Sequence, residues 1–167
     1  MSTLTLDELN AMAQSDFVAA LGDVYEHSPW VAEAAWTDRP FESVETLHQR
    51  MKQAVDTASR EQQLELLRAH PDLGEQTEMT DSSKQEQAEA GLDQLSKAQY
   101  ETFDRLNETY RDTFDFPFIM AVKNESPDAI ETAMRARIDN SPAREFRTAI
   151  DEVHTIARFR LDERIEP

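Results

Sequence analysis

The sequence contains no cysteine, which excludes disulfide bonds, thiol nucleophiles and zinc–thiolate sites. Glycine is also scarce, with three residues in all, and the Asn-Gly and Asp-Gly pairs typical of β-hairpins are absent. No apolar run approaches the ~18 residues that a membrane-spanning helix needs. These absences favour an α-helical protein that has no membrane partner.

Positive charge is the other shortage. Lysine and arginine together number 17 against 34 acidic residues, so the formal net charge is −17, and only four of the basic residues are lysines. A surface of this sign repels phosphate backbones, so we expect no nucleic-acid partner. An acidic, lysine-poor composition is typical of proteins from a high-salt cytoplasm, where a Debye length of about 3 Å at 1 M screens the repulsion. The first residues also lack the basic and apolar regions of a signal peptide, so we expect a halophilic, cytoplasmic protein.

Helix-start patterns recur along the chain and predict an all-α fold. The serine-proline pairs are Ser28-Pro29, Ser126-Pro127 and Ser141-Pro142, and capping-box spacing begins at Thr5, Ser59, Ser83 and Ser96. We expect helices near 5–13, 15–26, 29–36, 43–57, 60–70, 83–92, 97–114, 127–139 and 142–162. With 167 residues and no linker-like segment, the chain is expected to form one domain over residues 1–167, a bundle of eight or nine helices.

Two segments are expected to lie outside the helices. Residues 74–82 form the longest polar stretch and predict a loop. Residues 114–122 (FDFPFIMAV) are apolar, but a proline interrupts them and they are too short for a helix of their own.

His70 stands at the predicted end of the helix over 60–70, because Pro71 disfavours the α conformation in the residue before it. It follows Leu67 by three residues and so projects beside the apolar stripe of that helix. The negative end of a helix dipole favours protonated imidazole, so His70 can titrate near neutral pH. A helix terminus with a hydrogen-bonded histidine explains the position without chemistry, and on local grounds it is the simpler interpretation.

Ser83, Glu86 and Gln87 open the next predicted helix. An ordinary capping box accounts for Ser83 and Glu86, and local evidence favours this interpretation. The adjacent carboxylate and carboxamide of Glu86 and Gln87 can also bind a small planar molecule that carries several N–H and C=O groups.

Arg160 falls on the apolar stripe of the last predicted helix, which runs through Ile150, Val153 and Ile156-Ala157. A guanidinium on a core-facing stripe needs an anion or several carbonyls, because it cannot lose its proton. An internal carboxylate and a ligand carboxylate satisfy this need equally well. Arg158, together with His154 one turn earlier, is expected on the outward-facing surface.

The usual signatures of cofactor and metal sites are missing from the sequence. It has no GxGxxG or GxxxxGK[ST] loop, no GxSxG elbow, no HExxH and no EF-hand loop. The four histidines are at least 21 residues apart, which excludes a short-range metal-ligand pattern. We therefore expect neither a metal nor a cofactor.

Four stretches together carry a family resemblance: HPDLG at 70–74, SKQEQAEAGL at 83–92, FDRLNETYRDTFDFPFIMAVK at 103–123 and ARFRL at 157–161. In order and approximate separation they resemble the 2-oxo-4-hydroxy-4-carboxy-5-ureidoimidazoline (OHCU) decarboxylase family, which completes the route from urate to (S)-allantoin. The resemblance covers the chain from about residue 10 to 162. It implies an all-helical, cofactor-free carboxy-lyase that acts on a small ureidoimidazoline and is commonly a homodimer.

The resemblance also assigns roles to individual residues. His70 resembles the essential catalytic histidine of the family, held by Pro71, and Glu86 and Arg160 complete the catalytic set. The substrate-binding residues that it implies are Pro71, Ser83, Glu86, Gln87, Phe118, Ile119, Met120, Ala121 and Arg160. Among these, residues 118–121 resemble a segment whose backbone lines the pocket and bonds the ring, and Arg160 resembles the arginine that grips the substrate.

Two positions depart from the common family pattern. Asp115 stands where many relatives have glycine or lysine, and we expect it to face outward between two buried aromatic residues. Asn124 replaces a frequent glycine, which it can mimic because asparagine tolerates the left-handed backbone conformation.

Two other functions fit the same sequence. A non-enzymatic acidic helical module would pair Arg160 internally and use His70 only to end a helix. A related ureide lyase or hydrolase of purine catabolism would use a similar site on another substrate. The decarboxylase predicts a pocket where His70, Glu86 and Arg160 converge, although they are 16 and 74 residues apart in sequence.

Overall fold

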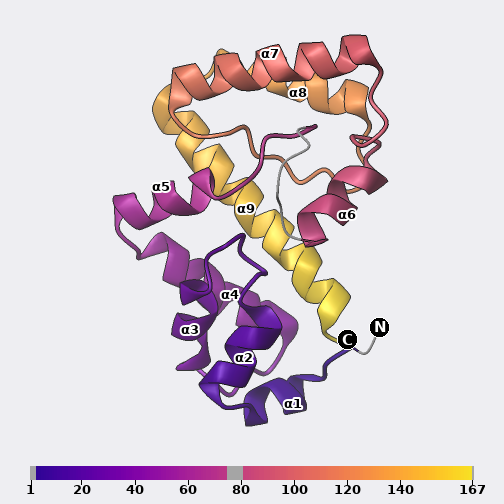
Figure 1. Cartoon of the computed structure of the whole chain (residues 1–167). Helices are drawn as coiled ribbons and strands as arrows, with labels where there is room; N and C mark the ends of the chain where they lie inside the picture. The colour runs from indigo at the N-terminus through magenta and orange to yellow at the C-terminus, as the bar shows by residue number, and fades with distance from the viewer. Residues whose placement is uncertain (1–2, 75–80, 167) are drawn as a thin grey trace. The chain divides into compact units, whose positions relative to one another are not determined.

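The computed structural model describes residues 3–74 and 81–166 (Figure 1). Within these ranges the regular structure is helical, apart from an isolated bridge between Leu4 and Ile165. The helices are α1 (Leu6–Ala11), α2 (Gln14–Leu21), α3 (Trp30–Trp36), α4 (Val44–Asp56), α5 (Arg60–Arg68), α6 (Asp81–Glu89), α7 (Lys97–Phe114), α8 (Pro127–Ile138) and α9 (Pro142–Arg164). The prediction of an all-α fold with eight or nine helices is confirmed, and most predicted helix ends fall within two residues of the observed ones.

Most of the predicted helix starts are confirmed by their capping bonds. Ser59 and Ser96 form complete capping boxes, and the hydroxyl of Ser126 accepts from the N–H of Ala129, with Pro127 in the first turn. These bonds satisfy N–H groups that the helix itself leaves without partners.

Two of the predicted N-caps were wrong. Ser28 does not cap α3, because its hydroxyl donates to the carbonyl of Glu26 at 2.9 Å and Pro29 occupies the cap position. Ser83 does not begin a helix either, because α6 already starts at Asp81 and places Ser83 inside its first turn. Both serines are buried, so local capping spacing was outweighed by tertiary packing.

Only the two ends of the predicted loop over residues 74–82 lie within the described residues. Gly74 lies in a turn with φ of +82°, Asp81 and Ser82 belong to α6, and residues 75–80 lie outside the described residues. The predicted apolar segment over 114–122 is confirmed as non-helical after Phe114, which ends α7.

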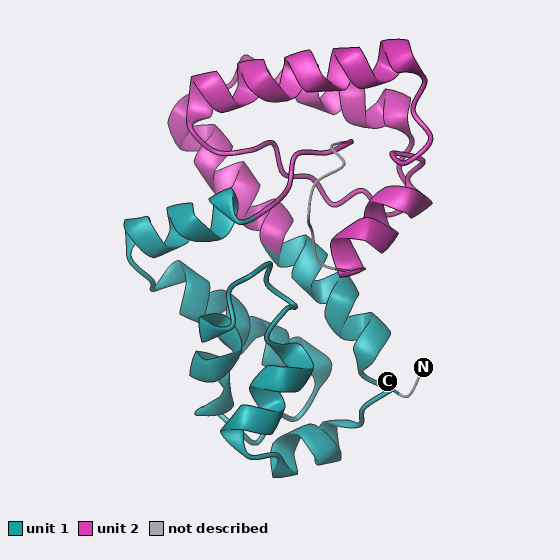
Figure 2. Ribbon diagram, viewed as in Figure 1, with its two compact units in different colours: residues 1–69, 154–167 teal, residues 70–153 magenta. Residues whose placement is uncertain are grey.

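The chain divides into two compact units (Figure 2). Unit 1 comprises residues 1–69 and 154–167, and unit 2 comprises residues 70–153. Helix α9 contributes its first half to unit 2 and its second half to unit 1. The expectation of one domain over residues 1–167 stays a prediction.

Unit 1 is built around α2, α3 and α4, with α3 packed against both of its neighbours. Its core contains fully buried side chains from each of these helices, including Phe17, Ala35 and Leu47. The two terminal segments pair in this unit, because Leu4 exchanges backbone hydrogen bonds with Arg164 and Glu166 at 2.8 and 2.7 Å.

Unit 2 packs α7 against α8 and holds an aromatic cluster formed by Tyr110, Phe114, Phe116, Phe118 and Phe146. Asp115 ends α7 in the left-handed conformation with φ of 68° and is exposed between two buried phenylalanines, as predicted. Asn124 also has a positive φ, 66°, which confirms its glycine-like role. No helix in the described ranges is long and apolar enough to cross a membrane.

Candidate functional site

His70 lies just beyond the end of α5. The helix ends at Arg68 with Ala69 as its C-cap, two residues earlier than predicted, and His70 is the first residue of unit 2. Its side chain and that of Pro71 are half-buried, whereas the next three residues, 72–74, are buried. The motif HPDLG therefore enters the interior of unit 2 with its histidine at the edge.

Three interactions fix the buried part of this motif. The carboxamide of Asn107 donates to the carbonyl of Leu73 at 2.9 Å, and the carboxylate of Asp72 pairs with Arg111. Both partners lie on α7, in the third of the motif stretches. The N–H of Gly74 donates to Oε1 of Gln87 on α6 at 3.0 Å, which joins the first and second motif stretches.

The predicted substrate-binding residues of α6 share one face of that helix. Ser83 and Gln87 are four residues apart and both buried, and Glu86 is half-buried beside them. Because Gln87 bonds Gly74, this face lies against the segment that carries His70. The structure therefore brings three of the four motif stretches together within unit 2.

The fourth stretch contributes Arg160, which belongs to unit 1 and is buried to 1% exposure. Its Nη1 donates to the carbonyls of Asp23 and Val24, each at 3.2 Å, and lies 3.7 Å from Oε1 of the fully buried Glu26. These carbonyls are available because α2 ends at Leu21, five residues before its predicted end. The core-facing position predicted for Arg160 is confirmed, and an internal carboxylate accompanies it.

Residues 118–121 form a non-helical segment after α7. Phe118 and Ile119 are buried, whereas Met120 and Ala121 are half-buried. Arg137 of α8 donates through Nη1 to the carbonyl of Ile119 at 2.7 Å. The N–H of Ala121 donates to a carboxylate oxygen of Glu152 on α9 at 3.2 Å. Side chains from two helices thus hold the backbone of this segment.

Arg137 itself belongs to a buried polar cluster. Its guanidinium pairs with Glu145 at 2.9 Å and lies over the ring of Phe118, 4.4 Å from the centroid. Glu145 is fully buried and also accepts from the hydroxyl of Tyr110 at 2.5 Å and from Asn140 at 2.8 Å. Burial and the bond to Glu145 raise the pKa of Tyr110, which keeps its hydroxyl a donor.

Glu152 is held in a partly buried position where its charge is disfavoured. Burial raises the pKa of its carboxyl above the usual value of 4.5, and the N–H of Ala121 and the charge of Arg137 oppose this rise.

The prediction that His154 faces outward with Arg158 was wrong. His154 is 5% exposed, and its Nδ1 accepts from the hydroxyl of Tyr25 at 2.8 Å while Nε2 faces Asp56 at 3.1 Å. Its backbone carbonyl accepts from Nε2 of His48 at 2.9 Å. Burial lowers the pKa of His48 and raises that of Tyr25, which favours the neutral form of both side chains.

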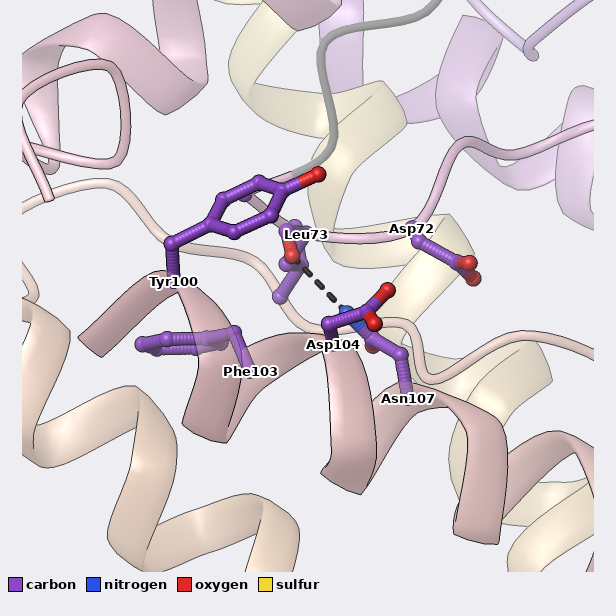
Figure 3. Close-up of a pocket in the computed structure, with 7 residues that line it drawn as sticks. Asp72, Leu73, Tyr100, Phe103, Asp104 and Asn107 are labelled. Carbon is purple, nitrogen blue, oxygen red and sulfur yellow. Dashed lines mark hydrogen bonds between the residues drawn. The ribbon is translucent and has the colours of Figure 1, made fainter. Parts of the chain in front are cut away.

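A small surface hollow lies beside the motif in unit 2 (Figure 3). It is lined by Asp72, Leu73, Gly74, Tyr100, Phe103, Asp104 and Asn107. Within the described residues, one side-chain oxygen of Asp72 and the side-chain oxygen of Asn107 are buried without a hydrogen-bond partner. None of the predicted substrate-binding residues lines this hollow, and no group of three or more His, Cys, Asp or Glu side chains in the described ranges could hold a metal ion.

Sequence reasoning missed several charged residues that the fold withdraws from solvent: Glu26 and Glu145 are buried, and Arg137 and Glu152 are half-buried. A signal was present for one of them. Glu145 precedes Ala149 and Val153 by four and eight residues, so it lies on a buried face of α9, as Arg160 does.

Comparisons with known proteins agree with this arrangement of motifs. The OHCU decarboxylase family matches residues 10–162. A 2-oxo-4-hydroxy-4-carboxy-5-ureidoimidazoline decarboxylase from Haloferax volcanii is 64% identical over 164 residues, 98% of each chain. The protein of the same name from Halalkalicoccus jeotgali is 58% identical over 167 residues, which are 100% of this chain and 95% of its own.

A solved structure supports the fold. The crystal structure of an (S)-allantoin synthase superposes with a TM-score of 0.80 at 36% identity, and the match covers 97% of this chain and 54% of the other. The family match spans most of the chain, and the two haloarchaeal relatives are similar over nearly their whole length. The chain therefore belongs to the OHCU decarboxylase family.

Proposed function

We propose that this protein decarboxylates 2-oxo-4-hydroxy-4-carboxy-5-ureidoimidazoline to (S)-allantoin, the last step of urate degradation, with His70 as its catalytic histidine. The observation that carries the proposal is the convergence of three motif stretches in unit 2, where Gly74 bonds Gln87 and Leu73 bonds Asn107. If residues 70–74 served only to end α5, they would not need hydrogen bonds to two other motif stretches.

The substrate supplies its own electron sink. Its carboxylate sits on a ring carbon that also carries a hydroxyl and adjoins a C=N bond. When the bond to the carboxylate breaks, carbon dioxide leaves, the electron pair forms a C=C bond to the neighbouring carbon, and the nitrogen of the former C=N bond takes up one proton. The hydroxyl then loses its proton to become the ring carbonyl, and one proton is delivered to the neighbouring carbon. Such a substrate needs no pyridoxal, thiamine or metal to hold the electron pair.

His70 performs the proton transfers. Imidazole can both accept and donate a proton near neutral pH, so this side chain can accept the hydroxyl proton and help to set the face that is protonated. A positioned general base of this kind contributes roughly 10²- to 10⁴-fold to a rate. The reaction also proceeds without an enzyme, so control of the product's stereochemistry is part of the function.

The other predicted residues bind and orient the substrate. Arg160 grips the carboxylate and stabilises negative charge, because a guanidinium fork matches a carboxylate in shape and charge. The side chains of Ser83, Glu86 and Gln87 bind the N–H and C=O groups of the ureido group and of the ring, and the backbone of residues 118–121 forms the rest of the substrate-binding site. The bond from Gly74 to Gln87 gives Gln87 a further role, since it also fixes the motif that carries His70.

The protein acts as a homodimer in the cytoplasm. The family resemblance supports the homodimer, and the net charge of −17 supports a compartment with high salt. Light scattering of the purified protein at high salt measures the assembly directly, and a monomer at working concentration would contradict it.

The direct test follows circular dichroism of OHCU made freshly from hydroxyisourate, with and without the wild-type protein. The proposal predicts rapid accumulation of (S)-allantoin. A related ureide lyase or hydrolase would leave the OHCU signal unchanged and consume another ureide, and a non-enzymatic module would consume neither.

A further inference from the structure

We infer that Arg137 and Glu152 are positioning residues for the decarboxylation, because they orient the two peptide groups on either side of Met120 toward the substrate. The inference rests on the proposed function, which assigns the backbone of residues 118–121 to the substrate-binding site. It adds two side chains, from α8 and α9, that the family motifs do not include.

Side chains of α8 and α9 hold the backbone of residues 118–121. Residues 118–121 lie outside the helices, so no helical ladder fixes their peptide groups. Arg137 binds the carbonyl of Ile119 at 2.7 Å, and Glu152 binds the N–H of Ala121 at 3.2 Å. These two bonds act on consecutive peptide groups, one before Met120 and one after it.

The geometry of the peptide group determines where the backbone of Met120 points. In a planar trans peptide the C=O and the N–H point in opposite directions. The carbonyl of Ile119 shares its peptide with the N–H of Met120, so the bond to Arg137 turns that N–H away from Arg137. The N–H of Ala121 shares its peptide with the carbonyl of Met120, so the bond to Glu152 turns that carbonyl away from Glu152.

The backbone of Met120 can bind a ligand through both its N–H and its C=O. No hydrogen bond to the backbone N–H or C=O of Met120 occurs within the described part of the chain, and the residue is half-buried. One residue thus presents a donor and an acceptor, each oriented by a charged side chain on the far side of its peptide. This pair is complementary to a ring amide or ureide edge, which offers one C=O and one N–H.

The surroundings make the arrangement rigid. Arg137 is fixed by the fully buried Glu145 at 2.9 Å and by the ring of Phe118, so the atom that binds Ile119 has little freedom. A hydrogen bond whose donor is already ordered costs little further entropy when a substrate arrives. Arg137 and Glu152 bond the two peptide groups that flank Met120, so their effect on the reaction passes through Met120.

The test compares two replacements of Glu152 in steady-state assays with OHCU. Glu152→Gln keeps an oxygen that can accept from Ala121, and KM and kcat are expected to stay within about twofold of wild type. Glu152→Leu removes the acceptor, and KM is expected to rise about tenfold, the value of one hydrogen bond, with a smaller change in kcat. Glu108→Leu, an exposed position on α7, is the matched control and should leave both constants unchanged.

Arg137→Lys provides a second variant in case Glu152→Leu does not fold, as judged by far-UV circular dichroism and thermal melting. Lysine keeps the charge opposite Glu145 but loses the guanidinium that contacts two groups at once, so KM is expected to rise at least threefold. The pH profile of kcat/KM in Glu152→Gln should match wild type, because a positioning residue does not transfer the reacting proton.

Each outcome decides between the alternatives. A folded Glu152→Leu protein, or a folded Arg137→Lys protein, with the KM of wild type would overturn the inference while leaving the decarboxylase assignment intact. Glu152→Gln as impaired as Glu152→Leu would also overturn it, because the charge and not the acceptor would then matter. A wild-type protein without activity on OHCU would instead refute the proposed function.

Discussion

Replacing Glu26 should destabilise unit 1 more than any surface substitution. Glu26 is fully buried, and its carboxylate lies 3.7 Å from the guanidinium of Arg160, whose side chain is 2% exposed. Removing one partner of a buried ion pair leaves an uncompensated charge and typically costs about 3–5 kcal/mol. The carbonyls of Asp23 and Val24 continue to solvate Arg160, so we expect Glu26→Gln to lose about 3 kcal/mol, at the lower end of that range.

Urea unfolding followed by circular dichroism measures this loss. The midpoint should fall by about 1–2 M for an m-value of roughly 2 kcal/mol/M. Glu131→Gln serves as the control, because Glu131 pairs with Arg135 on the exposed face of α8, where such a pair contributes roughly 0.5 kcal/mol or less. A Glu26→Gln protein within about 1 kcal/mol of wild type would refute the reasoning about burial.

A paired replacement separates stability from catalysis. Glu26→Leu combined with Arg160→Met removes both charges and keeps the volume, which is often nearly neutral for stability. The double variant should therefore be more stable than Glu26→Gln and yet lack decarboxylase activity, since the proposed partner of the substrate carboxylate is gone. Wild-type activity in a folded double variant would contradict the role of Arg160.

Three further predictions concern acid, backbone strain and salt. Burial lowers the pKa of His48 below 6.5, so as the pH falls below 6.5 the unfolded chain takes up a proton before the folded protein does, and the free energy of unfolding decreases. His48→Gln should weaken this pH dependence, measured as the melting temperature across pH 5–8. Gly74→Ala should lower the free energy of unfolding in urea by about 1–2 kcal/mol, because φ of Gly74 is +82° and an added Cβ would lie 3.1 Å from Leu95. An unchanged urea midpoint would contradict this. With a net charge of −17, the melting temperature should rise as KCl increases from about 0.1 to about 2 M, and a flat response would count against high-salt adaptation.

The helices were predicted well from the sequence, because the capping residues and prolines that start a helix lie close together in the chain. The capping boxes at Ser59 and Ser96 and the proline after Ser126 depend on residues within one turn, and the structure shows all three. The same rules were wrong at Ser28 and Ser83, where burial against other elements decided the helix start.

The polar interior was harder to predict, because it depends on contacts between residues far apart in sequence. Arg160 was identified from its place on an apolar stripe, but its partner Glu26 precedes it by 134 residues and no spacing rule connects them. His154 was placed on the surface, yet its bonds to Tyr25 and Asp56, 129 and 98 residues away, hold it inside. Charged and polar side chains are mostly exposed in proteins, so a pattern method assigns them outward by default.

The motif stretches showed which residues belong together but not how. Three of the stretches meet in unit 2 through the bonds of Gln87 and Asn107. The convergence of His70, Glu86 and Arg160 in one pocket stays a prediction, because Arg160 belongs to unit 1 and the other two belong to unit 2.

The central claim is that His70 controls the proton transfers that give (S)-allantoin. The most direct measurement follows circular dichroism of freshly made OHCU with wild-type protein and with His70→Asn, after thermal melting has shown that the variant is folded. The account predicts optically pure (S)-allantoin from wild type, and from His70→Asn a decay no faster than without enzyme, with no preference for either enantiomer. Optically pure (S)-allantoin from His70→Asn at the wild-type rate would contradict it.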